Sequence, residues 1–203
     1  VKIIISLTLS SFIILSTLVI SLSTNSSVIP KLLLIDNFKF EKTYQMKKAF
    51  KVNGWSILGI HGSGDDSHRK WEWYQKILLG AKFSHHPLNP QFQKAQVSLK
   101  DTTFSPGLSK SFDGNDEWYV FLNQPKDATI VYSIDGDKIL PSGNMLWMKD
   151  KNFGMGKNHP VAWHKKVGKG KTFYTSMGHS KEVWANPDFV SLIEEAIKWG
   201  YRK

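Results

Sequence analysis

The chain has 203 residues, 41% of them hydrophobic and none of them cysteine, so it can form one domain with a sizeable core but no disulfide, thiolate metal site or cysteine nucleophile. Its formal net charge is +10, yet the 27 basic residues are scattered and no run of them reaches five. The charge therefore predicts a basic surface, and we expect no nucleic-acid partner.

The N-terminal segment has the pattern of an export signal. Lys2 precedes an apolar run over residues 3–22 that carries no charge, and small polar residues follow it. This order is typical of a secretory signal peptide, and a run of about 20 residues can also span a bilayer. We therefore expect residues 1–24 to be a signal peptide or membrane anchor and residues 25–203 to be one α/β domain, in a protein that is periplasmic, extracellular or anchored to the membrane.

Strand and helix patterns alternate along the rest of the chain, which is typical of α/β domains. Helical patterns cover residues 41–52 and 69–79. Residues 106–116 are rich in Gly, Ser and Asp and predict a loop, which a short apolar segment follows over residues 117–122. Apolar and alternating runs predict strands at residues 31–36, 55–60, 95–100, 128–134, 145–148, 161–166 and 172–176, of which the last two form a hairpin.

The last helix is the most sharply defined element. Asn186 is the expected N-cap, and Pro187 occupies the first helical position, where its missing N–H is harmless. Apolar residues recur after it at helical spacing and predict a buried stripe, made of Phe189, Ile193, Ala196 and Ile197.

Five segments along the chain form a specific combination: WSILGIHG (55–62), WEWYQKILLGAKFSHHP (71–87), DEWYVF (116–121), HPVAW (159–163) and GKGKTFYTSMGH (168–179). Taken together, in this order and spacing, they resemble the trehalose-utilisation family, whose domain is called ThuA-like. The resemblance implies a flavodoxin-like three-layer α/β sandwich, similar to class I glutamine amidotransferases, and a role in carbohydrate metabolism. The amidotransferase reaction is excluded, because it needs a cysteine nucleophile.

The front of the chain departs from the family's pattern. A complete domain of this family opens with strand, helix and strand before the strand expected here at residues 31–36. The first β-α-β unit is therefore expected to be missing, as in an N-terminally truncated chain. The alternative is that the apolar N-terminal run substitutes for part of the sheet, because the loss of an inner strand would expose a long apolar edge.

Four polar residues are candidates for a functional site. In open α/β sheets, ligands bind beyond the carboxyl ends of the strands. His61 follows the strand at 55–60, and His179 follows the strand at 172–176. Glu117 comes after the predicted loop, and His86 lies in a turn after the helix at 69–79. We expect His61, His179 and Glu117 to be the catalytic residues if these segments converge.

Two kinds of chemistry fit these residue types. Neutral imidazoles suit a zinc-like divalent metal, for which His61, His86 and His179 are the candidate ligands, and a carboxylate can join them. Alternatively, His and Glu can exchange protons with a sugar hydroxyl near neutral pH. The spacing does not decide between these, and each histidine could instead cap a strand end or hold a loop.

Further residues near His61 are candidates for substrate binding. Asp65 and Asp66 can accept hydrogen bonds from sugar hydroxyls, or they can cap the following helix. Trp71 and Tyr74 offer either a stacking platform for a sugar ring or part of the core. His86 completes this candidate set.

The preferred interpretation is an exported ThuA-like domain that binds a sugar or sugar derivative and can transform it. One alternative is a non-catalytic carbohydrate-binding module, suggested by the 13% aromatic content. Another is an inactive truncated remnant. These interpretations differ in whether the protein is an enzyme.

Overall fold

The computed structural model describes residues 3–6, 33–34, 54–68, 70–140 and 156–202. The expected helix at 41–52 and the expected strand at 145–148 lie outside these residues. Of the expected strand at 31–36, only Leu33–Leu34 is described.

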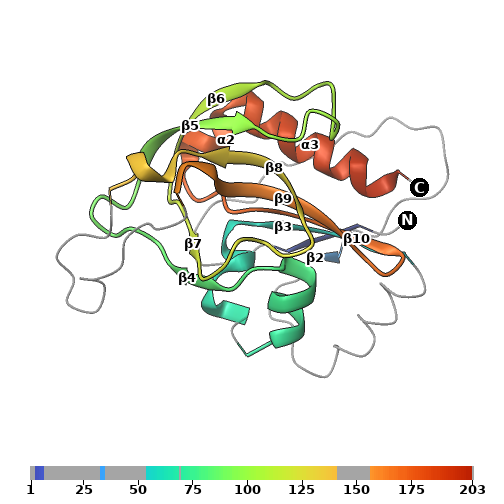
Figure 1. Cartoon of the computed structure of the whole chain (residues 1–203). Coiled ribbons are helices and arrows are strands. Elements are labelled where there is room, and N and C mark those ends of the chain that lie inside the picture. The colour runs from blue at the N-terminus through green and yellow to red at the C-terminus, as the bar shows by residue number, and fades with distance from the viewer. Residues whose placement is uncertain (1–2, 7–32, 35–53, 69, 141–155, 203) are drawn as a thin grey trace.

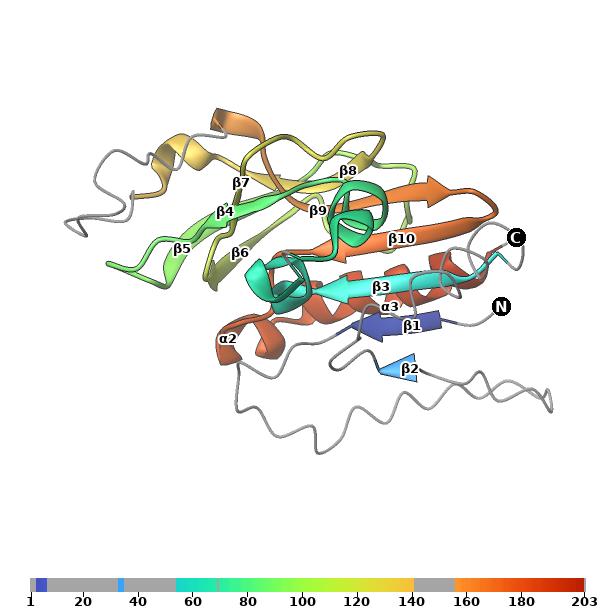
Figure 2. The same cartoon turned by 90° about the horizontal axis from the view of Figure 1, so that it is seen from below.

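An eight-stranded sheet forms the centre of the molecule, with its strands in the order β2-β1-β3-β10-β9-β8-β5-β6 (Figure 1, Figure 2). The first four strands in this order are parallel, and the other four continue the sheet in antiparallel pairs. The bounds are β1 Ile3–Ser6, β2 Leu33–Leu34, β3 Ser56–Ile60, β5 Gln93–Leu99, β6 Ser111–Asp116, β8 Thr129–Ile134, β9 His159–Val167 and β10 Gly170–Thr175. A separate two-stranded sheet pairs β4 (Phe83–His85) with β7 (Val120–Phe121).

Strand β1 comes from the apolar N-terminal run. It lies between β2 and β3 and pairs with β3 in parallel, with Ile4 opposite Ile57. This position matches the alternative in which the run supplies part of the sheet. The order β2-β1-β3 is also the order of flavodoxin-like sheets. Within the part of the chain that is described, no helix is both long and apolar enough to cross a membrane.

Helical elements cover both faces of the sheet. Figure 1 shows α3 (Pro187–Tyr201) on one face and the short turns η2 (His61–Gly64), η3 (Asp66–His68) and η4 (Tyr74–Leu79) on the other. The remaining elements are α2 (Lys181–Ala185), η5 (Gly136–Lys138) and η7 (Gly156–Asn158). This arrangement confirms the expected three-layer α/β architecture. The expected helix at 69–79 is shorter, and its main part is the π-helical turn η4.

Helix α3 begins and packs as its sequence predicts. The Asn186 side chain accepts a hydrogen bond from the Asp188 N–H at 2.9 Å, and Pro187 is in the first turn. The predicted stripe is buried, together with Leu192, against a core that includes Leu58, Val161 and Phe173. Full burial of a large apolar side chain contributes roughly 1.5–3 kcal/mol, so this stripe anchors the helix to the sheet.

The loop prediction for residues 106–116 is wrong over its second half. Residues 111–116 form β6, which pairs with β5 from Ser98↔Ser111 to Gln93↔Asp116. Gly, Ser and Asp have low strand propensity, but pairing and burial override propensity in a sheet. Burial alternates along β6, with Phe112, Gly114 and Asp116 inside. This strand therefore delivers Asp116 and Glu117 to the interior.

Candidate functional site

Three histidines surround one buried carboxylate. The Nε2 atom of His61 lies 3.2 Å from Glu117 Oε2, and the Nδ1 atom of His179 lies 3.4 Å from the same oxygen. His61 Nε2 and His179 Nδ1 are 2.9 Å apart. On the other carboxylate oxygen, Glu117 Oε1 is 3.0 Å from His86 Nδ1. We call His61, Glu117 and His179 the polar cluster, with His86 as its neighbour.

The backbone around His61 is held in an unusual conformation. His61 follows β3 directly and has a φ of 42°, in a region that few residues other than glycine adopt. Strand β10 and the residue after it hold His61 in place, because the Tyr174 hydroxyl donates to the His61 carbonyl at 2.9 Å and His61 Nδ1 lies 2.7 Å from the Ser176 carbonyl. Such outliers cost free energy and concentrate at functional sites.

Asp116 holds the turn that carries His179. Its carboxylate is fully buried and accepts hydrogen bonds from the backbone N–H groups of Gly178 at 2.6 Å, His179 at 3.1 Å and Ser180 at 2.9 Å. It also accepts from the N–H of Glu117 at 2.9 Å. The end of β6 is thereby tied to the segment after β10, although the two strands lie far apart in the sheet order.

Gly178 explains why the turn can come so close to His61. Its φ is 125°, and a Cβ atom placed there would lie 2.8 Å from Ile60 Cγ2 and 3.5 Å from His61 Cβ. Any larger residue would therefore push the His179 turn away from the end of β3. The Gly-His pair at this strand end is a packing requirement of the cluster.

The electrostatics of the cluster favour an ionised Glu117. Burial alone would raise the pKa of this carboxyl, but hydrogen bonds from His179, His61 and Gln91 hold it well below its ordinary value. The hydrogen bond to Glu117 in turn raises the pKa of His179, against the opposing effect of burial. Glu117 is therefore a fixed anion, and His179 is the imidazole that holds a proton more strongly than usual.

The cluster opens towards solvent on the side of His179 and His86. The side chains of His61 and Glu117 are 6% and 3% exposed, whereas those of His179 and His86 are 26% and 29% exposed. Phe92 lies at this rim, 40% exposed, with its ring 5.2 Å from the ring of His179. A ligand can therefore approach His179 next to an apolar ring.

The sequence matches the ThuA family, described as trehalose utilisation, over residues 24–200. The chain belongs to this family. Among solved structures it is similar to a ThuA-like protein of Bacteroides uniformis, with 22% identity over 86% of this chain and 79% of the other and a TM-score of 0.62. It is also similar to a ThuA-like protein of Parabacteroides merdae, with 15% identity, coverages of 84% and 72%, and a TM-score of 0.61. At such identities the likeness concerns the fold, and no curated protein matches the chain.

In this ThuA-family domain, the four polar residues singled out from the sequence meet at one place. His61, Glu117 and His179 form the polar cluster, and their donor atoms lie close enough together to hold a metal ion. His86 contacts the opposite oxygen of Glu117, so it supports the carboxylate. It is not part of the triangle that His61 Nε2, Glu117 Oε2 and His179 Nδ1 form. Of the three candidate metal-ligating histidines, His61 and His179 therefore lie in the group of three, and His86 lies beside it.

The other predicted substrate-binding residues have different environments. Asp66 is exposed in the first turn of η3, as a capping residue would be, and Asp65 is half-buried just after η2. The charge of Asp65 adds to the effect of burial in raising the pKa of Tyr119, whose ring lies 4.2 Å from that of His61.

Trp71 and Tyr74 are buried, which does not fit the exposed aromatic platform expected from the sequence. Their side chains are 7% and 2% exposed and stack on each other at 5.2 Å, in a core cluster with Ile57 and Leu78. Tyr74 lies on η4 and Trp71 just before it, and both rings are buried, so they contribute to the stability of the fold through the hydrophobic effect. Neither ring can stack on a sugar in this arrangement.

Three residues of the site escaped the sequence analysis. Asp116 precedes Glu117 in a segment that was predicted to be loop, Gln91 donates to Glu117 Oε1 at 2.5 Å, and Tyr119 packs on His61. The adjacent acids Asp116 and Glu117, placed directly before a run of apolar residues, were the one available signal. A buried acid pair in such a position needs partners, and here both members have them.

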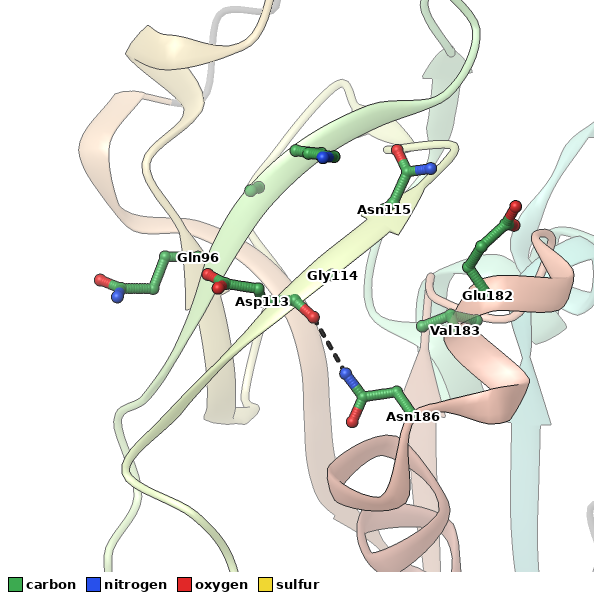
Figure 3. A pocket seen from close by; sticks show the side chains of 9 residues that line it. Gln96, Asp113, Gly114, Asn115, Glu182, Val183 and Asn186 are labelled. Atoms are coloured by element: carbon green, nitrogen blue, oxygen red, sulfur yellow. Dashed lines mark hydrogen bonds between the residues drawn. The ribbon is translucent and has the colours of Figure 1, made fainter.

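A separate cavity of about 460 Å³ lies between β5, β6 and α2, and none of its lining residues belongs to the polar cluster (Figure 3). Gln96 and Asp113 line it from the strands, and Glu182 lines it from α2. At its rim, Asn186 donates to the Asp113 carbonyl at 2.9 Å. That bond caps the outer edge of β6, where an unpaired strand would otherwise be exposed.

Proposed function

We propose that this ThuA-family protein binds a sugar or sugar derivative at the polar cluster and acts on one of its hydroxyl groups. The observation that carries the proposal is the convergence of His61, His86 and His179 on one buried carboxylate. Buried titratable groups that converge in this way, two of them, Glu117 and His179, with shifted pKa values, are typical of functional sites. The family's description, trehalose utilisation, supports a carbohydrate as the ligand.

The residues have distinct roles in this proposal. Glu117 has a pKa that is too low for an effective proton acceptor near neutral pH, so it serves as the anion that orients the imidazoles. His179 is the partly exposed member and meets the substrate hydroxyl, which it can polarise by proton exchange or as a ligand of a shared cation. Phe92 provides the apolar face beside it.

A non-catalytic binding module is less well supported. That interpretation needs exposed aromatic rings that stack on sugars, and it predicts that binding is lost on Trp71→Ala while surviving His61→Ala. Trp71 and Tyr74 are core residues here. The inactive remnant is also less well supported, because the Glu117 carboxylate at the centre of the cluster is paired with His61, His86, His179 and Gln91.

Saturation-transfer NMR with trehalose and glucose as probes tests the proposal. We expect His179→Ala to weaken sugar binding about ten- to a hundredfold, since a hydrogen bond to a charged group is worth roughly 1.5–3 kcal/mol and 1.4 kcal/mol is tenfold. His164→Ala is the matched control, because His164 is also paired with a carboxylate, Asp101, at 3.3 Å, but lies outside the cluster. Equal binding by both variants would contradict the proposal.

We also propose that the protein acts outside the cytoplasm. The basic start and the uncharged run at residues 3–22 support export, whereas the pairing of Ile3–Ser6 within the sheet as β1 argues against cleavage of that run. Mass spectrometry of the protein from separated cell fractions tests this, by giving both its location and its first residue. Recovery from the cytoplasmic fraction alone would contradict it.

A further inference from the structure

The donor atoms of the polar cluster have the arrangement of a metal site. We propose that His61 Nε2, Glu117 Oε2 and His179 Nδ1 together bind one divalent cation of the zinc class. The inference goes beyond the proposed function, because it needs no sugar and stands on the geometry of these three atoms alone.

The separations between the three atoms fit a single ion. They are 2.9, 3.2 and 3.4 Å. Zinc binds imidazole nitrogen and carboxylate oxygen at about 2.0–2.2 Å, so two vertices of its tetrahedron are separated by roughly 3.3–3.6 Å. The 3.4 Å distance lies in this range, the 3.2 Å distance lies next to it, and the 2.9 Å distance between the two histidine nitrogens would have to lengthen by a few tenths of an ångström.

His61 faces the triangle with its Nε2 atom. Its Nδ1 atom lies 2.7 Å from the Ser176 carbonyl oxygen, which can only accept, so Nδ1 carries the hydrogen. When Nε2 also carries a hydrogen it donates to Glu117 Oε2, 3.2 Å away, and when it does not, its lone pair is free to bind a cation in the place of that hydrogen. A cation in that place would bind His61 Nε2, Glu117 Oε2 and His179 Nδ1 together.

The groups around the triangle also match a metal site. Histidine ligands commonly donate their other ring N–H to a carbonyl, as His61 does to Ser176, and ligating carboxylates are themselves hydrogen-bonded. Here Glu117 Oε1 receives Gln91 Nε2 and contacts His86 Nδ1, while Oε2 faces the triangle. Two of the three ligands, His61 and Glu117, would therefore be oriented by a second contact before any ion arrives.

The composition of the triangle indicates which ion and what kind of site. Two imidazoles and one carboxylate suit zinc and similar transition metals, whereas magnesium and calcium prefer oxygen alone. Three protein ligands leave the fourth position open, as in catalytic zinc sites. The exposed side, at His179, is where a substrate oxygen could complete the coordination.

Isothermal titration of the full chain with ZnCl₂, after removal of metals with a chelator, tests the proposal. We expect one zinc ion per chain in the wild type and affinities lowered more than about a hundredfold in Glu117→Gln and in His179→Asn. The loss in His86→Ala should be about 10–100-fold, as for groups that orient a ligand. His164→Ala should bind zinc as the wild type does, and MgCl₂ should give no comparable binding.

Zinc binding that persists in both ligand variants, or that falls equally in His164→Ala, would overturn the proposal, as would the absence of zinc binding by the wild type. Circular dichroism of each variant shows whether it folds, and His179→Asn, at a partly exposed position, serves if Glu117→Gln does not. No sugar is present in this titration. A failure of sugar binding therefore leaves the zinc result intact, and the reverse also holds.

Discussion

Asp116 is predicted to be the residue on which the stability of the site most depends. Its buried carboxylate accepts N–H groups from three consecutive residues, Gly178, His179 and Ser180, and from Glu117. Asp116→Ala removes all four acceptor contacts. Each buried donor left without a partner costs about 1–3 kcal/mol, so the loss of four such bonds should cost at least about 4 kcal/mol. That is far above the typical effect of one substitution, which is around 1 kcal/mol.

Asp116→Asn provides a finer test of the same reasoning. The amide retains one oxygen, which can still accept from His179, Ser180 and Glu117, but it places an NH₂ group against the Gly178 N–H. The expected loss is therefore only about 1–3 kcal/mol. Asp113→Ala on the same strand is the control, because the exposed Asp113 side chain should contribute within about 0.5 kcal/mol.

Urea denaturation of the four proteins measures these differences through the unfolding midpoint at constant slope. The expected order of stability is wild type and Asp113→Ala together, then Asp116→Asn, then Asp116→Ala. Equal losses in the two Asp116 variants, or a loss below about 1 kcal/mol in Asp116→Ala, would refute the role assigned to this carboxylate.

Three other predictions concern burial, backbone and core. Burial lowers the pKa of His159 to about 4, so between pH 6.5 and pH 4 the unfolded chain binds a proton that the folded chain does not. The free energy of unfolding should therefore fall by about 3 kcal/mol as the pH falls through this range. In urea titrations at several pH values, the free energy of unfolding of His159→Gln should depend less on pH than that of the wild type. Gly178→Ala should lower both stability and zinc affinity, because its Cβ would lie 2.8 Å from Ile60 Cγ2, and an unchanged affinity would show that the His179 turn tolerates displacement. Trp71→Ala should cost about 3–5 kcal/mol by denaturation while zinc binding per folded molecule stays the same, and a selective loss of binding would return Trp71 to the site.

The polar cluster could be predicted in large part because strand ends are visible in sequence. His61 and His179 each follow an apolar run, and parallel neighbours end at the same edge of a sheet, so their approach is a consequence of β3 lying beside β10. Glu117 reaches them from the opposite end of the strand order. Its convergence depends on the bonds that Asp116 makes to the segment after β10, which no local pattern encodes.

The features that the sequence does not determine share a physical cause, namely that burial depends on packing between residues far apart in the chain. A continuous apolar run describes an export signal, a membrane span and a buried parallel strand equally well, and residues 3–6 take the strand form here. Trp71 and Tyr74 have the residue types of a sugar platform, but they face the core because η4 packs on the sheet. Strand β6 was missed because pairing with β5 outweighs its unfavourable composition.

The most direct test of the central claim, that the polar cluster is a ligand-binding centre, is to follow the ring nitrogens of the seven histidines by ¹⁵N NMR during addition of ZnCl₂. The account predicts that Nε2 of His61 and Nδ1 of His179 shift together at one equivalent, that Nδ1 of His61 keeps its hydrogen, and that His164 does not respond. Shifts spread evenly over His68, His164 and the cluster, or none at His61 and His179, would contradict it.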